Sequence, residues 1–107
     1  SRLVNALQVT FSSVGEAQRH DRSVLDFLER NPNALEENGI IYQKRKDGQL
    51  RVVLPTAFRL EALRDAHQNS GAHMGTKKTL KRLRAHYFWP KMELDVHRYI
   101  SGCAVCQ

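Results

Sequence analysis

Residues 67–73 read HQNSGAH and residues 103–106 read CAVC, so a pair of histidines and a pair of cysteines bound one segment of the chain. The spacing is His-x5-His, then 29 residues, then Cys-x2-Cys. Two thiolates and two neutral imidazoles form a closed, charge-neutral, four-coordinate site for Zn²⁺. We therefore predict one structural Zn²⁺, bound by His67, His73, Cys103 and Cys106.

The order of the two pairs excludes the geometry of a Cys2His2 finger. In that finger the cysteines come first, about a dozen residues before the histidines. Two simpler interpretations stay open, an incidental set of surface side chains or a redox Cys-x2-Cys, although a redox pair normally lies at a strand-to-helix junction. His86 and His97 are rival ligands, but we expect His86 to pack beside aromatic residues and His97 to be exposed. We expect His20 to lie on a helix surface.

The segment between the pairs predicts two short helices. After a loop over residues 68–75, Thr76 can cap a helix that runs to about His86. Its apolar side chains share one face at helical spacing; they are Leu80, Leu83 and Tyr87. The opposite side carries Lys77, Lys78, Lys81, Arg82 and Arg84. These cations either contact nucleic-acid phosphates or only solvate an outer face.

The second helix follows residues 88–90, which read Phe-Trp-Pro, and Pro90 is placed to open it. We expect Phe88 and Trp89 to lie in the core rather than to stack on a base. One apolar stripe of this helix consists of Met92, Val96, Tyr99 and Ile100. Gly102 can end the helix just before the cysteines.

Upstream, residues 16–29 predict a helix that ends before Asn-Pro-Asn at 31–33. Residues 40–43 and 50–54 are β-rich runs, and Asp47-Gly48 between them is a strong hairpin signal. Thr56 can cap a further helix whose body is residues 57–66. Residues 1–15 show no clear period, and we leave them unassigned as an arm or tag.

The whole chain has 107 residues, of which 41% are hydrophobic and 26% charged, so it fits one domain or two very small ones. No apolar run approaches the roughly 18 residues of a membrane span, and no signal peptide is visible. With two nearby cysteines and no initiator Met, we expect a fragment of a longer protein from a reducing compartment, with metal rather than a disulfide.

The net charge of +6 is concentrated near the C-terminus. Residues 75–107 contain seven Lys/Arg and two Asp/Glu, whereas residues 1–74 contain ten and nine. Such an excess favours a polyanionic partner. A core of three short helices is marginal alone, and a structural Zn²⁺ contributes about 10–16 kcal/mol in small peptides, which is enough to determine folding.

The motifs AHQNSGAHMGTKKTLKRL at residues 66–83 and HYFWPKMELDVHRYISGCAVCQ at 86–107 resemble the His-His-Cys-Cys zinc-binding domain of gypsy-type LTR-retrotransposon and retroviral integrases. Residues 16–55 are similar to the extension before that domain, with its AQ-x2-D helix start and its NG-x2-Y-x-K strand. The resemblance covers about residues 16–107. It implies an extension over 16–55 and a zinc-binding domain over 56–107.

The resemblance also implies a structural zinc site in a module that holds DNA ends and supports multimerisation during integration. The catalytic residues of the parent polynucleotidyl transferase would lie beyond Gln107, so we expect no enzyme activity in this fragment. Glu93 and Asp95 are expected to be solvent-facing charges. A nuclear destination is expected for the parent protein.

We therefore predict an α+β protein, a small helix and β-hairpin extension followed by a zinc-stabilised three-helix domain that is helix-turn-helix-like. Its function would be non-catalytic, with DNA and other integrase domains as partners and no membrane. The rival hypothesis is a protein-interaction module of a domesticated, integrase-derived host protein that has no DNA role. Salt-dependent DNA binding distinguishes the two.

Overall fold

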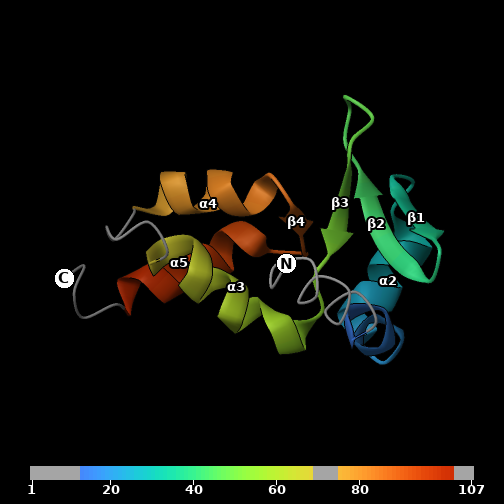
Figure 1. The fold of residues 1–107 in the computed structure, drawn as a ribbon, viewed down its shortest axis with the longest axis horizontal. Coiled ribbons are helices and arrows are strands. Elements are labelled where there is room, and N and C mark those ends of the chain that lie inside the picture. Colours follow the sequence, from blue (N-terminus) through green and yellow to red (C-terminus); the bar gives the residue numbers. More distant parts are fainter. Residues whose placement is uncertain (1–12, 69–74, 103–107) are drawn as a thin grey trace, which may run out of the picture.

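The computed structural model describes residues 13–68 and 75–102, which form a mixed α+β protein. A four-stranded sheet in the order β1-β2-β3-β4 lies between α2 and a group of three helices (Figure 1). The labelled elements are α2 (Arg22–Arg30), β1 (Ala34–Glu37), β2 (Ile40–Lys44), β3 (Leu50–Val53), α3 (Thr56–Gln68), α4 (Thr76–Arg84), β4 (Tyr87–Phe88) and α5 (Met92–Ser101). Residues 13–19 are also helical. No helix in this described part is long and apolar enough to cross a membrane.

The single helix predicted over residues 16–29 is wrong, because the chain turns at His20 and a new helix starts at Arg22. Asp21 is the N-cap of α2, and its carboxylate accepts hydrogen bonds from the Ser23 amide at 3.0 Å and the Ser23 hydroxyl at 2.6 Å. The same carboxylate accepts from the Thr56 amide at 2.6 Å, at the start of α3. Asp21 can accept hydrogen bonds at the starts of both α2 and α3 only if the helix predicted over residues 16–29 is interrupted at this position.

Gln18 fixes helix 13–19 to the sheet. Its side chain is fully buried, and its Nε2 donates to the carbonyl oxygens of Ile41 at 3.0 Å and Val53 at 2.7 Å. The Ile41 amide donates back to Gln18 Oε1 at 2.8 Å. Buried polar groups of this kind cost free energy unless they are paired, so one side chain joins β2, β3 and this helix.

The predicted hairpin is confirmed as the antiparallel pair β2–β3, with Tyr42 opposite Val52. Gly48 in its loop has a φ of +88°, a left-handed conformation that glycine adopts without strain. Strand β1 was not predicted. It pairs with β2 through Asn38-Gly39, whose φ values of 54° and 82° are those of a type I′ turn. Asn38-Gly39 is itself a hairpin signal, although it was interpreted only as the start of the NG-x2-Y-x-K strand.

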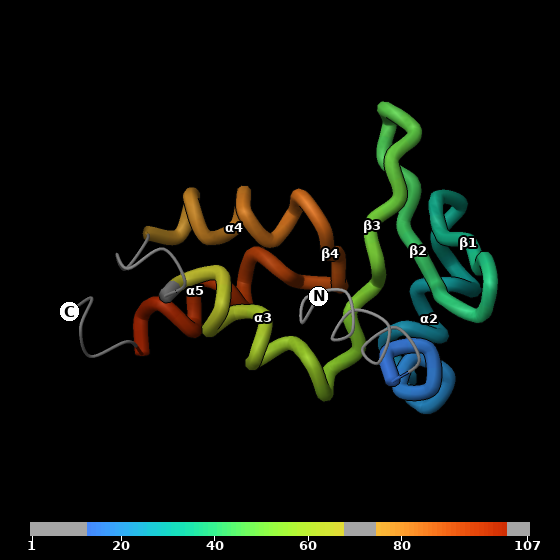
Figure 2. Tube along the Cα trace, viewed as in Figure 1, coloured from blue at the N-terminus to red at the C-terminus, as the bar shows by residue number. Residues whose placement is uncertain are grey.

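Strand β4 joins the N-terminal sheet to the helical part of the protein. It runs parallel to β3, with Val52 opposite Tyr87 and Val53 opposite Phe88. The Leu54 amide donates to the Phe88 carbonyl at 2.8 Å. The Phe88 ring packs on Phe27 of α2 with centroids 4.9 Å apart. Figure 2 shows β4 beside β3 at the boundary between the two parts. The extension and the helices therefore share one sheet.

Helices α3, α4 and α5 pack around a core that agrees with the predicted apolar faces. Leu80, Leu83, Trp89 and Val96 are buried, and Ile100 packs at the edge. That zinc stabilises these helices stays a prediction.

Several predicted helix ends are wrong. Helix α4 ends at Arg84 instead of His86, and its N-cap is Gly75 without a side-chain hydrogen bond, so Thr76 is not the cap. Helix α5 starts at Met92 after Lys91, whose φ is 64°, so Pro90 lies outside it. Residues 86–88 bond to β3 instead of continuing α4. Gly102 is the C-cap of α5, as predicted.

Candidate zinc site and basic cleft

The helix ends that flank the predicted metal ligands lie at one end of the molecule. Helix α3 ends at Gln68, α4 begins at Thr76 and α5 ends at Ser101. Figure 1 shows these three ends together, on the side away from the sheet. The predicted ligands His73, Cys103 and Cys106 lie outside the described residues.

His67 is the predicted ligand that the structure describes, and it is fully buried in the last turn of α3. Its ring meets the Tyr99 ring edge-on, with centroids 5.9 Å apart and an interplanar angle of 88°. Tyr99 lies near the end of α5, four residues before Cys103. The interpretation of His67 as an incidental surface histidine is therefore wrong, and its position beside the end of α5 fits a ligand shared with the Cys pair.

The rival histidines lie on the surface. His97 is exposed as expected. His86 is also exposed, and its ring lies edge-on to the Tyr87 ring at 6.2 Å, in agreement with the expectation that it packs beside an aromatic residue. His20 is exposed and faces Glu16 at 3.4 Å. Within residues 13–68 and 75–102, no three His, Cys, Asp or Glu side chains are grouped to hold a metal ion.

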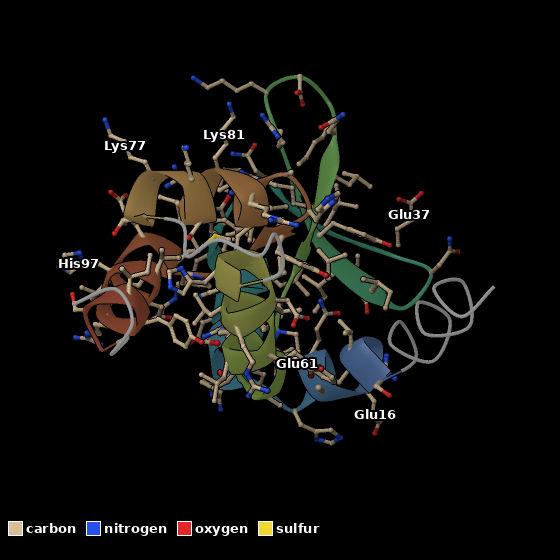
Figure 3. The ribbon with its side chains drawn as sticks, turned by 60° about the vertical axis from the view of Figure 1, so that its left-hand side comes forward. Glu16, Glu37, Glu61, Lys77, Lys81 and His97 are labelled. Carbon is tan, nitrogen blue, oxygen red and sulfur yellow. The ribbon has the colours of Figure 1, made fainter. Side chains whose placement is uncertain are left out.

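The five predicted cations of α4 are all exposed, and we call them the α4 basic face. They form two stripes at helical spacing. Lys77, Lys81 and Arg84 line a cleft, whereas Lys78 and Arg82 do not. Figure 3 shows Lys77 and Lys81 projecting outward from the same side of α4, away from the labelled Glu16 and Glu61.

The cleft lies between α4 and the β2–β3 hairpin and has a volume of about 570 Å³; we call it the hairpin cleft. The hairpin contributes Arg45 and Arg51 to it. The remaining lining residues are Leu80, Ala85 and Glu93. Five cationic side chains and one acidic side chain thus face the same space.

Arg51 connects the hairpin to α4. Its guanidinium donates to the Arg84 carbonyl at 3.2 Å and to Gln43 Oε1, and it lies over the Phe88 ring at 5.8 Å. Burial lowers the pKa of Arg51, and the charges of Arg45 and Arg84 lower it further. A cation at a helix C-terminus is favourable, so Arg51 is held in place despite its like-charged neighbours.

The two acidic residues of α5 have different environments. Glu93 is exposed and faces Arg84 at 3.6 Å. Asp95 is partly buried and accepts a hydrogen bond from Trp89 Nε1 at 2.9 Å, so its prediction as a solvent-facing charge is wrong. The buried indole needs an acceptor for its N–H, and Asp95 in the first turn of α5 supplies one. Trp89 is a core residue, as predicted.

Residues 54–107 match the family described as the integrase zinc binding domain. This chain belongs to that family. It is 36% identical over 63 residues to the Pro-Pol polyprotein of feline foamy virus, a match that covers 59% of this chain and 5% of the relative. It is 34% identical over 64 residues to gypsy retrotransposon integrase-like protein 1 of Homo sapiens, which covers 59% of this chain and 12% of that protein. The same protein of Macaca fascicularis is 33% identical over 66 residues, covering 61% of this chain and 12% of that protein. The matches thus span 5–12% of the relatives' lengths.

Membership of the integrase zinc-binding family supports the resemblance inferred from the His and Cys motifs, and it implies that the protein binds zinc. The matched domain of integrase-like proteins is a zinc-binding one and not a catalytic one. Arg45 and Arg51 were not predicted as members of a site. The basic run Lys44-Arg45-Lys46 was visible, but only the fold brings Arg45, together with Arg51 of β3, to the cleft beside α4.

Proposed function

We propose that this chain is the non-catalytic zinc-binding module of an integrase-like protein and that it supports DNA-end binding and multimerisation during DNA integration. The observation that carries the proposal is the exposed basic face of α4 on a member of the integrase zinc-binding family. The parent would be a polynucleotidyl transferase that acts in the nucleus.

The zinc part of the proposal assigns one structural Zn²⁺ to His67, His73, Cys103 and Cys106. Support comes from the burial of His67 beside the end of α5 and from the family match. Two thiolates and two imidazoles complete a tetrahedral site that leaves no position for a substrate. Its role would be to tie the ends of α3 and α5 to the start of α4.

The DNA part of the proposal assigns phosphate contacts to Lys77, Lys78, Lys81, Arg82 and Arg84. Exposed cations on one helix neutralise phosphates without reading bases, so binding should be weak and independent of sequence. Contacts of this kind typically give dissociation constants of about 10⁻⁴–10⁻⁶ M at physiological salt. Neighbouring modules in a multimer would add affinity through their linkage.

The test reverses three charges of the α4 basic face, Lys77→Glu, Lys78→Glu and Lys81→Glu. The side chains are exposed, and acidic residues are favourable in the first turn of a helix, where Lys77 and Lys78 lie. Lys81→Glu lies in the last turn and should cost about 0.3–1 kcal/mol, so the fold and zinc content should be kept. Fluorescence anisotropy with a short DNA duplex at low salt should show no binding. A control variant with the same charge change on α2 and α3, Arg22→Glu, Arg30→Glu and Arg64→Glu, should retain most of the affinity.

The same titration tests the rival hypothesis. A wild-type protein that binds no duplex even at low salt, yet self-associates in analytical ultracentrifugation, would favour a protein-interaction module instead. Equal losses in the α4 variant and its control would indicate an effect of net charge, and would contradict the assignment to α4.

A further inference from the structure

We propose that the hairpin cleft is a phosphate-binding site for the backbone of a nucleic acid, in which Arg45 of the hairpin acts with Lys77, Lys81 and Arg84 of α4. This inference rests on the proposed function and deepens it, because it adds the extension to the DNA-binding surface. In the sequence the two groups of cations are separated by more than 25 residues, and β3 and β4 bring them together.

Positive charge in the cleft outweighs negative charge. Three arginines of the hairpin and α4 face one space, and the acidic groups near them form only exposed ion pairs, Glu93 at 3.6 Å from Arg84 and Asp47 at 3.7 Å from Arg45. Exposed ion pairs of this kind contribute little to the stability of a protein. Burial and the charges of Arg45 and Arg84 act against the charge on Arg51, which lowers its pKa. An anion between these side chains would offset their repulsion.

The two arginines of the hairpin have different contacts. Arg51 is held by Gln43 and by the Arg84 carbonyl, and its buried Nε has no hydrogen-bond partner among the described residues. Arg45 has no such anchor; its guanidinium is partly exposed beside Asp47. Arg51 therefore positions the hairpin against α4, and Arg45 is the hairpin cation that can turn to an incoming anion.

The length of the charged stripe on α4 also favours a chain of phosphates. Lys77, Lys81 and Arg84 are seven residues apart from first to last, which is about 10 Å along a helix that rises 1.5 Å per residue. One strand of duplex DNA carries a phosphate about every 3.4 Å of its axis. The stripe is thus long enough to reach more than one phosphate of a strand, whereas a single small anion would use only part of it.

A guanidinium also favours phosphate over other anions. Its planar fork donates two parallel hydrogen bonds to one phosphate group. Two arginines at the hairpin end and a lysine-rich stripe along α4 therefore suit a chain of phosphates. Free phosphate and an acidic peptide share part of this chemistry, and the experiment separates them from nucleic acid.

The experiment compares Arg45→Gln with Lys46→Gln in the whole chain with zinc bound. Both residues lie in the same hairpin loop and both variants lose one positive charge, but only Arg45 lines the cleft. Anisotropy with a DNA duplex is measured from 0.02 to about 0.2 M salt, the range in which counterion release dominates. Arg45→Gln should weaken binding about fivefold to tenfold at 0.1 M salt and lower the log–log salt slope by about 0.9, the value for one phosphate contact. Lys46→Gln should change the affinity and the salt slope by smaller amounts.

Different failures have different meanings. If Arg45→Gln and Lys46→Gln behave alike while the α4 charge reversal abolishes binding, this inference is overturned and the proposed function stands. If the wild type binds no duplex, both are overturned. If inorganic phosphate, at matched ionic strength with chloride, displaces the duplex, the site takes free phosphate instead of a backbone. If polyglutamate binds as tightly as the duplex and is equally weakened by Arg45→Gln, the partner is an acidic protein.

Discussion

Asp21 is a single side chain that fixes the start of two helices. Its carboxylate caps α2 through Ser23 and accepts from the Thr56 amide at the start of α3. Burial alone would raise its pKa, but the hydrogen bonds from Ser23 and Thr56 and the charge of Arg59 lower the pKa from 3.8 to about 2. Arg59 also donates to Ser23 Oγ at 3.0 Å and lies over the Trp89 ring at 5.7 Å. The capping group is therefore connected to the core of the helical part.

We expect Asp21→Ala to lower the free energy of unfolding by about 2 kcal/mol at pH 7, because a lost N-cap alone costs about 1 kcal/mol and a second helix start also loses its acceptor. Urea unfolding followed by circular dichroism measures this. Because the folded pKa lies below the ordinary value, the contribution is complete above pH 3.8 and is lost as the pH falls toward 2. The difference between variant and wild type should therefore be the same at pH 7 and pH 5.

Asp26→Ala is the matched control for this prediction. Asp26 lies on the same helix, and its contact with Arg22 is 4.0 Å long and exposed, so its loss should cost little. An Asp21→Ala variant as stable as Asp26→Ala would contradict the role of Asp21 in both helix starts. A difference that changed between pH 7 and pH 5 would contradict the lowered pKa.

At the scale of elements, the features that were predicted correctly are those that depend on residues close together in the sequence. The Asp47-Gly48 turn gave the β2–β3 hairpin, and helical spacing gave the buried faces of α4 and α5. The two-residue strand β4 could not be predicted, because Tyr87 and Phe88 are strand residues only through their pairing with β3. Strand β1 contains the acidic pair Glu36-Glu37, which is poor in strand preference.

Long-range contacts also explain the rest of what the sequence did not show. The break at Asp21 depends on the Thr56 amide, 35 residues away in the sequence. The hairpin cleft depends on Arg51 meeting the end of α4, 33 residues away. By contrast, the candidate zinc ligands were visible as a spacing of residue types, because metal chemistry restricts which side chains can bind. The positions of His73, Cys103 and Cys106 stay a prediction.

The β3–β4 pair predicts which amides respond to loss of zinc. We expect one Zn²⁺ per chain, and we expect chelation to unfold α4 and α5 because their core is small. The Leu54 amide donates to Phe88 and the Val52 amide to His86, so both should lose hydrogen-exchange protection. The Ile41 amide donates to Gln18 within the extension, so it should keep much of its protection. Hydrogen exchange followed by NMR measures all three amides.

Two histidine variants control this experiment. His67→Ala should reproduce the chelated protein, whereas His97→Ala, which changes an exposed histidine, should retain zinc and the protection of Leu54. Metal analysis that finds no zinc, or unchanged protection of Leu54 after chelation, would contradict the prediction. Loss at Ile41 equal to that at Leu54 would show that the two parts unfold as one unit.

At the scale of the whole molecule, the excess of positive charge is concentrated on α4 and around the hairpin cleft. Figure 3 shows Glu16, Glu37 and Glu61 on parts of the molecule away from Lys77 and Lys81. Glu93 is the acidic residue that lines the hairpin cleft, where it faces Arg84. A like charge beside a bound polyanion is repulsive, and salt screens it. Glu93 should therefore limit the affinity of the cleft.

We expect Glu93→Gln to tighten duplex binding about twofold to fivefold at low salt, as the loss of one nearby repulsive charge at the surface implies. The gain should shrink as salt rises, because screening removes the same repulsion in the wild type. Anisotropy titrations at two salt concentrations measure it. Glu61→Gln makes the same charge change at an exposed position of α3 and should have a smaller effect. An equal effect would place the bound duplex elsewhere.

The parallel pairing of β3 with β4 also has a consequence for synthesis on the ribosome. Strands β1, β2 and β3 emerge first, and the partner of Val53 is made only when Phe88 has been added. Until then the nascent chain presents one side of β3 as an unpaired edge, which can pair with a strand of another polypeptide. Translation that stops between β3 and Tyr87 therefore yields a product prone to aggregate, whereas a chain completed through β4 has covered that edge.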